Sequence, residues 1–523
     1  MQRWIVLIFL ISFNVQAETC NWKDTIPCLT IIPNSNQLDY KIKPSDIITQ
    51  KDIKKFNLID LNKVLNFVNG TNAVQSGPIG QQSSLFLRGT NSNHTLVLLN
   101  GIPINDFSTP TGAFDFGQDF MYNVSMIQVY KGASASKFGA DAIGGAVNII
   151  TFVNHQNNIA TTDKSISGNY YKNINDWDIS IQGGGYKDKD KSALSGGTDK
   201  DSINNKSLAI NVNKWFNNIN FRSTLFTRNT FANIDGHSLD VQDGFSDNNF
   251  YALQSGLDYK TKDYTNYITL HTQAYDRQYE SDQYKSSNYF FKIGHQANTY
   301  GLGLDYKYDE SLTEDDDNVS LFANYNYSIF SLGARKDSDN ETYSVGLFKS
   351  LTGKLDIRAN HSTGYKKKTL WTSEEDSKTN EVSLDYSNLT LSLFQSDTGI
   401  QNQDGAEISY KKDNFNIFAS HLNSKKNGVV QLRRPKWKAG FNHFFNINKF
   451  TLITDYSFIG QSYDIHNSNW STIKMKELHL INFGIEKNGF IIKATNLLNQ
   501  KFQMPHGFTG EDRQFTLGYN KKF

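Results

Sequence analysis

The sequence predicts a membrane β-barrel of about 22 antiparallel strands with an N-terminal mixed α/β domain inside the barrel. Between Ser83 and Thr151, short runs rich in Val, Ile and Leu are stopped at close intervals by Gly or Asn-Gly, which is typical of a compact mixed domain with tight turns. From about Ser165 onward, polar and apolar residues alternate. After the first residues there is no apolar run of about 18, so no transmembrane helix is expected.

The N-terminus has the features of a secretory signal peptide, expected over residues 1–17. Arg3 supplies a positive charge, Trp4–Phe13 is apolar except for Ser12, and Val15–Ala17 is a small-residue cleavage site. The alternative is a single membrane anchor, for which the apolar run is too short. The mature chain should begin at Glu18.

Residues 18–44 show no periodicity and are expected to be a flexible periplasmic segment. They contain Pro27, Pro33 and the only two cysteines, Cys20 and Cys28. Two cysteines this close in an exported chain favour a small disulfide loop over a metal site, because no further Cys or His lies nearby.

The compact domain is expected over residues 45–155. Residues 45–50 lead into a helix, and Asp60 should cap a second helix that ends before Gly70. Strands are predicted from Leu85, over Thr95–Leu99, and at two later segments, Ile127–Tyr130 and Ala146–Ile150. Asn100-Gly101 predicts a type I′ hairpin, because both central positions of that turn need positive φ. Gly132–Gly145 should turn twice on its glycines.

Residues 156–523 are expected to form one barrel. Period-two alternation marks about twenty segments, among them Ser207–Val212, Tyr267–His271, Ser320–Tyr327, Ser344–Phe348, Glu381–Tyr386, Leu389–Phe394, Phe415–Ser420 and Phe450–Tyr456. About 22 strands of roughly ten residues leave on the order of seven residues per connection. The rival interpretation, several soluble β domains, would need linkers rich in Pro, Gly and Ser, and the region has none.

Composition and motifs argue against nucleic-acid binding and catalysis. The formal net charge is only +1, which gives no reason to expect a nucleic-acid partner. The eleven His are scattered, and neither HExxH nor GxSxG occurs, so the chain is not expected to be an enzyme. The glycines of 132–145 fit neither GxGxxG nor GxxxxGK[ST], and tight turns explain them better.

The chain resembles the TonB-dependent outer-membrane receptors along nearly its whole length. The motifs that carry the resemblance are Phe86–Gly89, Leu96–Gly101, Lys131–Ala133 through Phe138-Gly139 to Gly144–Thr151, and Asn496–Asn499 with the final Phe523. Within the family, Arg88–Leu98 and Asp141–Gly145 are most similar to the cobalamin (corrinoid) transporters. The resemblance implies TonB-dependent import of a corrinoid, with a ferric siderophore or haem as the alternative substrate. A passive pore or adhesin is a further alternative, but a passive pore needs no plug.

The resemblance also implies partners and a location. The barrel should lie in the bacterial outer membrane, among lipid and lipopolysaccharide. The TonB–ExbB–ExbD energy complex should grip an N-terminal segment by β-strand addition. The candidate segment is Leu29, Thr30, Ile31 and Ile32, with Asp24–Ile26 as the alternative segment. An ordinary disordered tail is the other interpretation of these residues. The short loops suggest a simplified receptor or a surface lipoprotein partner.

Two plug loops are the candidate ligand contacts, because the family places the plug apices there; the alternative is a solvated turn. The candidate residues are Ser76, Gly77, Pro78, Gln81, Asn105, Asp106, Phe107, Ser108 and Thr109. Arg88 is interpreted differently: a buried Arg must be paired, so a structural ion pair is expected.

Aspartates near the start of the barrel form a candidate calcium site, because cobalamin transporters hold calcium with aspartates in early extracellular loops. The residues are Asp199, Asp201 and Asp235, with Asp240, Asp243 and Asp247 close in sequence. Carboxylates on neighbouring loops can supply the six to eight oxygens that calcium prefers. The alternative is a set of solvated loop carboxylates. No covalently bound cofactor is expected.

Overall fold

The computed structural model describes residues 45–523 except 57–58, 190, 237–243, 313 and 413. The predicted signal peptide, the cysteine pair Cys20 and Cys28, and the candidate TonB-binding segments lie outside the described residues. Within the described ranges, no helix is both long enough and apolar enough to cross a membrane.

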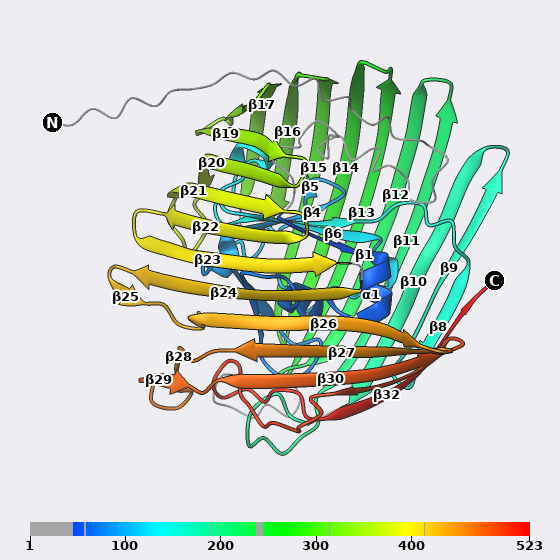
Figure 1. Ribbon diagram of the computed structural model, residues 1–523, viewed down its shortest axis with the longest axis vertical. Helices are drawn as coiled ribbons and strands as arrows, with labels where there is room; N and C mark the ends of the chain where they lie inside the picture. The colour runs from blue at the N-terminus through cyan, green and yellow to red at the C-terminus, as the bar shows by residue number, and fades with distance from the viewer. Residues whose placement is uncertain (1–44, 57–58, 190, 237–243, 313, 413) are drawn as a thin grey trace.

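A small domain, the plug, lies inside a ring of strands (Figure 1, blue to cyan). Its five-stranded mixed sheet has the order β1-β6-β7-β4-β5, and β2 and β3 form a separate hairpin. The elements are β1 (Asp46–Thr49), α1 (Gln50–Phe56), α2 (Leu61–Asn66), β2 (Thr71–Gln75), β3 (Ser83–Leu87), β4 (Thr95–Leu99), β5 (Ile102–Pro103), β6 (Met126–Lys131), α3 (Ala135–Phe138) and β7 (Gly145–Ile150).

Several local predictions for the plug are confirmed. Asp60 is the N-cap of α2, and its side chain accepts a hydrogen bond from the backbone N–H of Lys63. Asn100 and Gly101 have φ of 50° and 84° and join β4 to β5 as an antiparallel pair. Two features differ: the strand β1 precedes the first helix, and the short helix α3 interrupts the stretch expected to contain only glycine turns.

The plug shares an apolar core with the barrel wall. Leu65 and Phe116 of the plug belong to the same cluster of buried side chains as Phe250 and Tyr275 of the wall. The Tyr275 hydroxyl also donates a hydrogen bond of 2.7 Å to the Ile104 carbonyl. The plug is therefore packed against this part of the wall and does not merely occupy the lumen.

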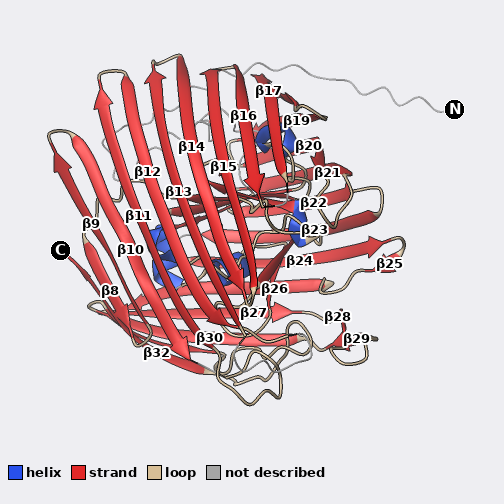
Figure 2. Cartoon of the chain, turned by 180° about the vertical axis from the view of Figure 1, so that it is seen from behind, coloured by secondary structure: helices blue, strands red, loops and turns tan. Residues whose placement is uncertain are grey.

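The remaining strands close into an antiparallel barrel of 22 spanning strands, as the sequence predicts, seen from behind in Figure 2. Closure comes from the pairing of β32 with β8. The last plug strand ends at Ile150 and the first barrel strand begins at Asn158; the boundary expected from the sequence was 155/156.

The barrel strands are β8 (Asn158–Thr162), β9 (Ser165–Ile174), β10 (Trp177–Lys189), β11 (Ser202–Phe216), β12 (Ile219–Asn233), β13 (Phe245–Lys260), β14 (Tyr264–Tyr279), β15 (Asp282–Ala297), β16 (Tyr300–Ser311), β17 (Asp315–Tyr327), β18 (Phe330–Lys336), β19 (Glu341–Thr352), β20 (Leu355–Lys366), β21 (Glu375–Tyr386), β22 (Leu389–Asp397), β23 (Gln401–Lys412), β24 (Phe415–Lys426), β26 (Trp437–Ile447), β27 (Phe450–Ile459), β30 (Leu478–Lys487), β31 (Phe490–Thr495) and β32 (Gln514–Lys522). Short pairs within loops are β25 (Val429–Val430), β28 (Ser462–Ile465) and β29 (Thr472–Met475).

Alternation along each strand separates the two faces of the wall. In β14, Thr269 and His271 are buried toward the plug, whereas Ile268 and Leu270 are exposed on the outer face. This is the pattern of a lipid-facing barrel with a polar interior.

The two ends of the barrel differ in their connections. One end, here the short-turn end, has tight turns such as Asn175-Asp176, whose φ values of 50° and 64° suit a type I′ hairpin. The other end, the long-loop end, carries the longest connections, 190–201, 460–477 and 496–513.

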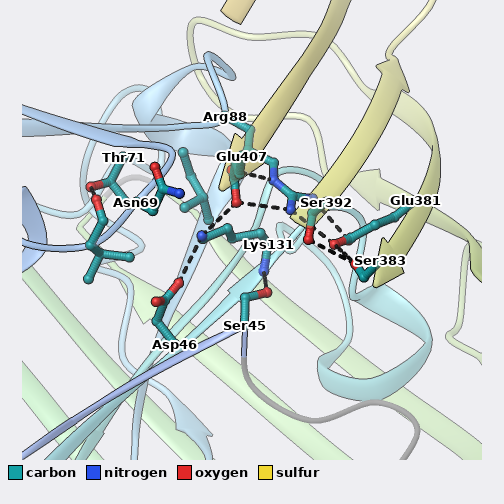
Figure 3. Close-up of polar contacts among 12 residues, drawn as sticks. Ser45, Asp46, Asn69, Thr71, Arg88, Lys131, Glu381, Ser383, Ser392 and Glu407 are labelled. Carbon is teal, nitrogen blue, oxygen red and sulfur yellow. Dashed lines mark hydrogen bonds and ion pairs between the residues drawn. The ribbon is translucent and has the colours of Figure 1, made fainter. Parts of the chain in front are cut away.

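Five charged side chains form a network that fastens the plug to the wall (Figure 3). Arg88, just after β3, places its Nε 2.9 Å from Glu407 of β23 and its Nη1 3.0 Å from Glu381 of β21. Lys131, at the end of β6, places its Nζ 2.9 Å from Glu407 and 2.8 Å from Asp46 of β1. Glu407 thus joins two plug cations, and β1 is tied to the same network.

Most of this network is shielded from solvent. The side chains of Arg88 and Lys131 are each 3% exposed and that of Glu407 is 6% exposed. The ring of Phe394 lies 4.3 Å from the guanidinium carbon. Buried charges are tolerated when they are paired, and loss of one partner leaves a charge uncompensated. The prediction that Arg88 forms a buried ion pair is confirmed.

Glu407→Gln should loosen the plug. The change removes the charge shared by Arg88 and Lys131 but keeps the size of the side chain, and breaking a buried ion pair costs about 3–5 kcal/mol. We expect protease to cleave the plug of the purified variant at a lower denaturant concentration than in wild type. Glu341→Gln is the matched control, because its ion pair with Lys336 is exposed and such pairs contribute about 0–1 kcal/mol. Equal resistance of the Glu407 variant and wild type would contradict the role of the network.

Candidate functional site

A cavity of about 730 Å³ lies between loops at the long-loop end of the barrel. Its walls come mainly from loops 190–201, 460–477 and 496–513, and the plug contributes Asn72 and Val74 of β2. The volume falls in the range of about 300–1,000 Å³ that is usual for small-molecule sites. We call it the upper cavity.

Positive charge exceeds negative charge in the lining of the upper cavity. Asp512 pairs with Lys191 at 3.0 Å and with Lys501 at 2.6 Å. Two further lysines of the lining, Lys474 and Lys476, are exposed and form no ion pair with the described residues. The cations of the lining are Lys191, Arg433, Lys474, Lys476 and Lys501, and the carboxylates are Asp464, Glu477 and Asp512. The cavity is therefore suited to an anionic ligand of small-molecule size.

The first predicted ligand loop, which contains Ser76, Gly77, Pro78 and Gln81, lies beneath loop 190–201. The Gln81 side chain is buried and donates a hydrogen bond to the Asn233 carbonyl. A Cβ added at Gly77 would lie 2.6 Å from the Ala193 Cβ. The plug residues that reach the upper cavity are instead the neighbouring ones of β2, which the sequence analysis did not select.

The second predicted ligand loop spans the barrel away from the upper cavity. Asp106 is buried, 3.0 Å from the Arg277 Nε of β14, and it accepts a hydrogen bond of 2.7 Å from Ser286 of β15. The Pro110 carbonyl accepts a hydrogen bond of 2.9 Å from Thr369. The other predicted contacts, Asn105, Phe107, Ser108 and Thr109, are partly exposed in this loop. Ligand contact by either loop stays a prediction.

Three of the predicted calcium ligands lie together. One carboxylate oxygen from each of Asp199, Asp201 and Asp235 falls within 4.8 Å of the others. The Asp201 carboxylate also accepts a hydrogen bond of 2.6 Å from the backbone N–H of Ala193, and Asp235 accepts one of 2.8 Å from that of Leu194. The cluster thus joins loop 190–201 to the connection after β12.

Three carboxylates lie close together in this cluster. Burial raises the pKa of Asp201 to about 7, and the neighbouring Asp235 and Asp199 carboxylates add to this effect. Three carboxylates offer the hard oxygen ligands that calcium prefers, so the residues fit the ion. Asp240 and Asp243 lie outside the described residues, and Asp247 of β13 instead accepts a hydrogen bond from Asn229. Calcium binding stays a prediction.

If the cluster binds calcium, the ion should stabilise the folded protein. A ligand that binds only the native state raises Tm. We expect calcium to raise the Tm of purified wild type and to leave the Asp201→Asn/Asp235→Asn variant unchanged. Asp247→Asn is the control, because its side chain lies outside the cluster, and this variant should respond like wild type. A wild-type Tm that does not respond to calcium would contradict the site.

Both the plug and the whole fold are similar to those of known proteins. Residues 41–146 match the family model described as TonB-dependent Receptor Plug Domain. The siderophore receptor PiuA from Acinetobacter baumannii is similar in structure, with a TM-score of 0.74, 14% identity, and 92% of this chain and 97% of that chain covered. The ferric yersiniabactin uptake receptor FyuA from Yersinia pestis has a TM-score of 0.75 and 12% identity, with 92% of this chain and 98% of that chain covered. The closed form of the ferric-catecholate import receptor Fiu from E. coli K12 has a TM-score of 0.76 and 12% identity, with 91% of this chain and 96% of that chain covered.

At these identities the solved structures establish the fold alone. The family match covers the plug, and the structural matches cover both plug and barrel. Residues 41–146 are therefore similar to the TonB-dependent receptor plug domain, and the whole chain has the fold of a plugged barrel like these solved receptors.

Proposed function

We propose that this protein imports an anionic iron chelate, such as a ferric siderophore, across the outer membrane, driven by the TonB–ExbB–ExbD complex. The observation that carries the proposal is the excess of positive charge around the upper cavity, directly above the plug. Ferric citrate and ferric catecholate complexes are anions, so this charge would attract them and hold them. The names of PiuA, FyuA and Fiu, each given for a siderophore or ferric chelate, support the same substrate class.

The orientation follows from the loops. Outer-membrane barrels have short periplasmic turns and longer extracellular loops, so the long-loop end and the upper cavity face outward. The plug is fastened to β21 and β23, on another part of the wall, by the network around Glu407. A plug held in this way supports an energised receptor over a passive pore, because it must be loosened before a substrate can pass.

Import of a corrinoid is the second candidate. The aspartate cluster favours it, because the similarity to cobalamin transporters implies calcium in these loops. The solved structures named above give it no support, since none of their names mentions a corrinoid. We therefore prefer the iron chelate, which was the alternative substrate in the sequence analysis.

Isothermal titration of the purified protein separates the two candidates. Ferric citrate and a ferric tris-catecholate are the iron probes, and cyanocobalamin is the corrinoid probe. We expect one iron probe to bind, and Lys474→Gln/Lys476→Gln to weaken that binding roughly tenfold, because the two lysines contribute charge to the lining.

The control for this test is Lys349→Gln, an exposed lysine on β19 near the short-turn end. It removes a charge of the same kind but lies away from the upper cavity, so affinity should stay at the wild-type value. Binding of cyanocobalamin without binding of either iron chelate would overturn the proposal in favour of corrinoid import.

A further inference from the structure

Three cavities lie in series along one side of the plug. The upper cavity shares lining residues with a middle cavity of about 190 Å³, and the middle cavity shares Phe67 with a lower cavity of about 90 Å³. The lower cavity reaches Asn414, in the turn after β23 at the short-turn end. The residues between the upper and middle cavities are Ile459, Leu478, Phe502, Met504 and Gly510. The series therefore extends from one end of the barrel to the other.

The middle cavity lies between α2 and the wall formed by β26, β27 and β30–β32. Lys438 of β26 lines it and is 4% exposed. Its Nζ donates a hydrogen bond of 2.7 Å to the Thr71 carbonyl and one of 3.3 Å to the Asn66 side chain. Lys438 therefore links the wall to the last residue of α2 and the first residue of β2.

Lys438 differs from the other buried cations that hold the plug. Arg88 and Lys131 each contact a carboxylate at 3.0 Å or less. In the part of the chain that the structure describes, Lys438 has hydrogen-bond acceptors but no carboxylate within 4 Å. A buried ammonium group without a counter-charge is costly, and an anion entering the middle cavity would lower that cost.

The ion pairs between plug and barrel strands lie mainly on other parts of the wall. Arg88 binds β21 and β23, Asp106 binds Arg277 of β14, and Asp119 binds Arg228 of β12. On the side of the middle cavity, the polar links among the described residues are the Lys438 hydrogen bonds and an ion pair of 3.1 Å between Lys63 and Glu511 of loop 496–513. Apolar packing on Phe444 of β26 and Ile453 of β27 also holds the plug here. This side therefore has fewer ion pairs to break than the others if the plug is to open.

We propose that the substrate crosses the barrel along the α2 side of the plug, and that Lys438 is an anion-binding residue midway along this route. The inference rests on the proposed function, since it assumes import of an anionic chelate. An anionic group in the middle cavity competes with the Thr71 carbonyl and Asn66 for the Lys438 ammonium. Its arrival therefore weakens the hold of the wall on α2 and β2, so that the plug, when energised, opens at that place.

The test compares three variants of the full-length protein: Lys438→Met, Lys438→Arg and Lys292→Met. Methionine keeps much of the lysine stem and removes the charge, whereas arginine keeps the charge. Lys292 of β15 is the matched control, because it is also 4% exposed in the lumen but lies on the opposite wall, 3.9 Å from Asp305. For each variant we would measure binding of the iron chelate that wild type binds, energised uptake of that chelate by cells, and resistance of the plug to protease.

We expect Lys438→Met to bind the chelate within about twofold of wild type and to import it at least about tenfold more slowly, with Lys438→Arg and Lys292→Met near wild type. Uptake by Lys438→Met at the wild-type rate would overturn the proposed route but not the proposed function. A loss of uptake that arginine does not restore, accompanied by a protease-sensitive plug, would also overturn it, since Lys438 would then be structural. If wild type neither binds nor imports either chelate, the proposed function fails and the route fails with it.

Discussion

Glu407 is the residue on which the joining of plug and barrel depends. One carboxylate of the barrel wall receives two cations from separate plug elements, and all three side chains are buried. Such a group must be fully paired or it destabilises both domains. The Glu407 carboxylate also leaves no room for a side chain at Gly70. A Cβ added there, where φ is 69°, would lie 1.9 Å from the Glu407 Oε1. Gly70 must therefore stay small for the carboxylate to reach Arg88.

The plug is held asymmetrically. Ion pairs hold it against β12, β14, β21 and β23, whereas the upper and middle cavities lie beside the wall from β26 to β32. The network around Glu407 also includes Asp46, the first residue of β1. Because β1 pairs with β6 at the edge of the plug sheet, a pull on β1 would act on that sheet and on the ion pairs of Lys131 at the same time.

Sequence reasoning succeeded where the signal is local. The Asp60 cap and the Asn100-Gly101 turn depend on neighbouring residues, and the barrel strands depend on alternation within each segment. The helix α3 was missed because four residues flanked by glycines carry no helical periodicity. The need for a partner to Arg88 could be predicted, but not its identity, since Glu407 lies 319 residues away.

The candidate site shows the same limit. The closeness of Asp199, Asp201 and Asp235 agrees with the expectation of one cluster, because all three stand near the ends of adjacent strands. The upper cavity cannot be predicted from the sequence, because its lysines come from loops that meet only after the barrel closes. Loop 190–201 also covers the plug loop that the sequence favours as a ligand contact.

The most direct test of energised import is accumulation of a radioactive ferric chelate by cells in which this protein is the sole receptor, before and after a protonophore collapses the proton-motive force. The fastened plug predicts that surface binding persists and accumulation stops, because binding alone does not loosen the network around Glu407. Accumulation that continued at the same rate after the collapse would contradict this account, because the protein would then be a passive pore.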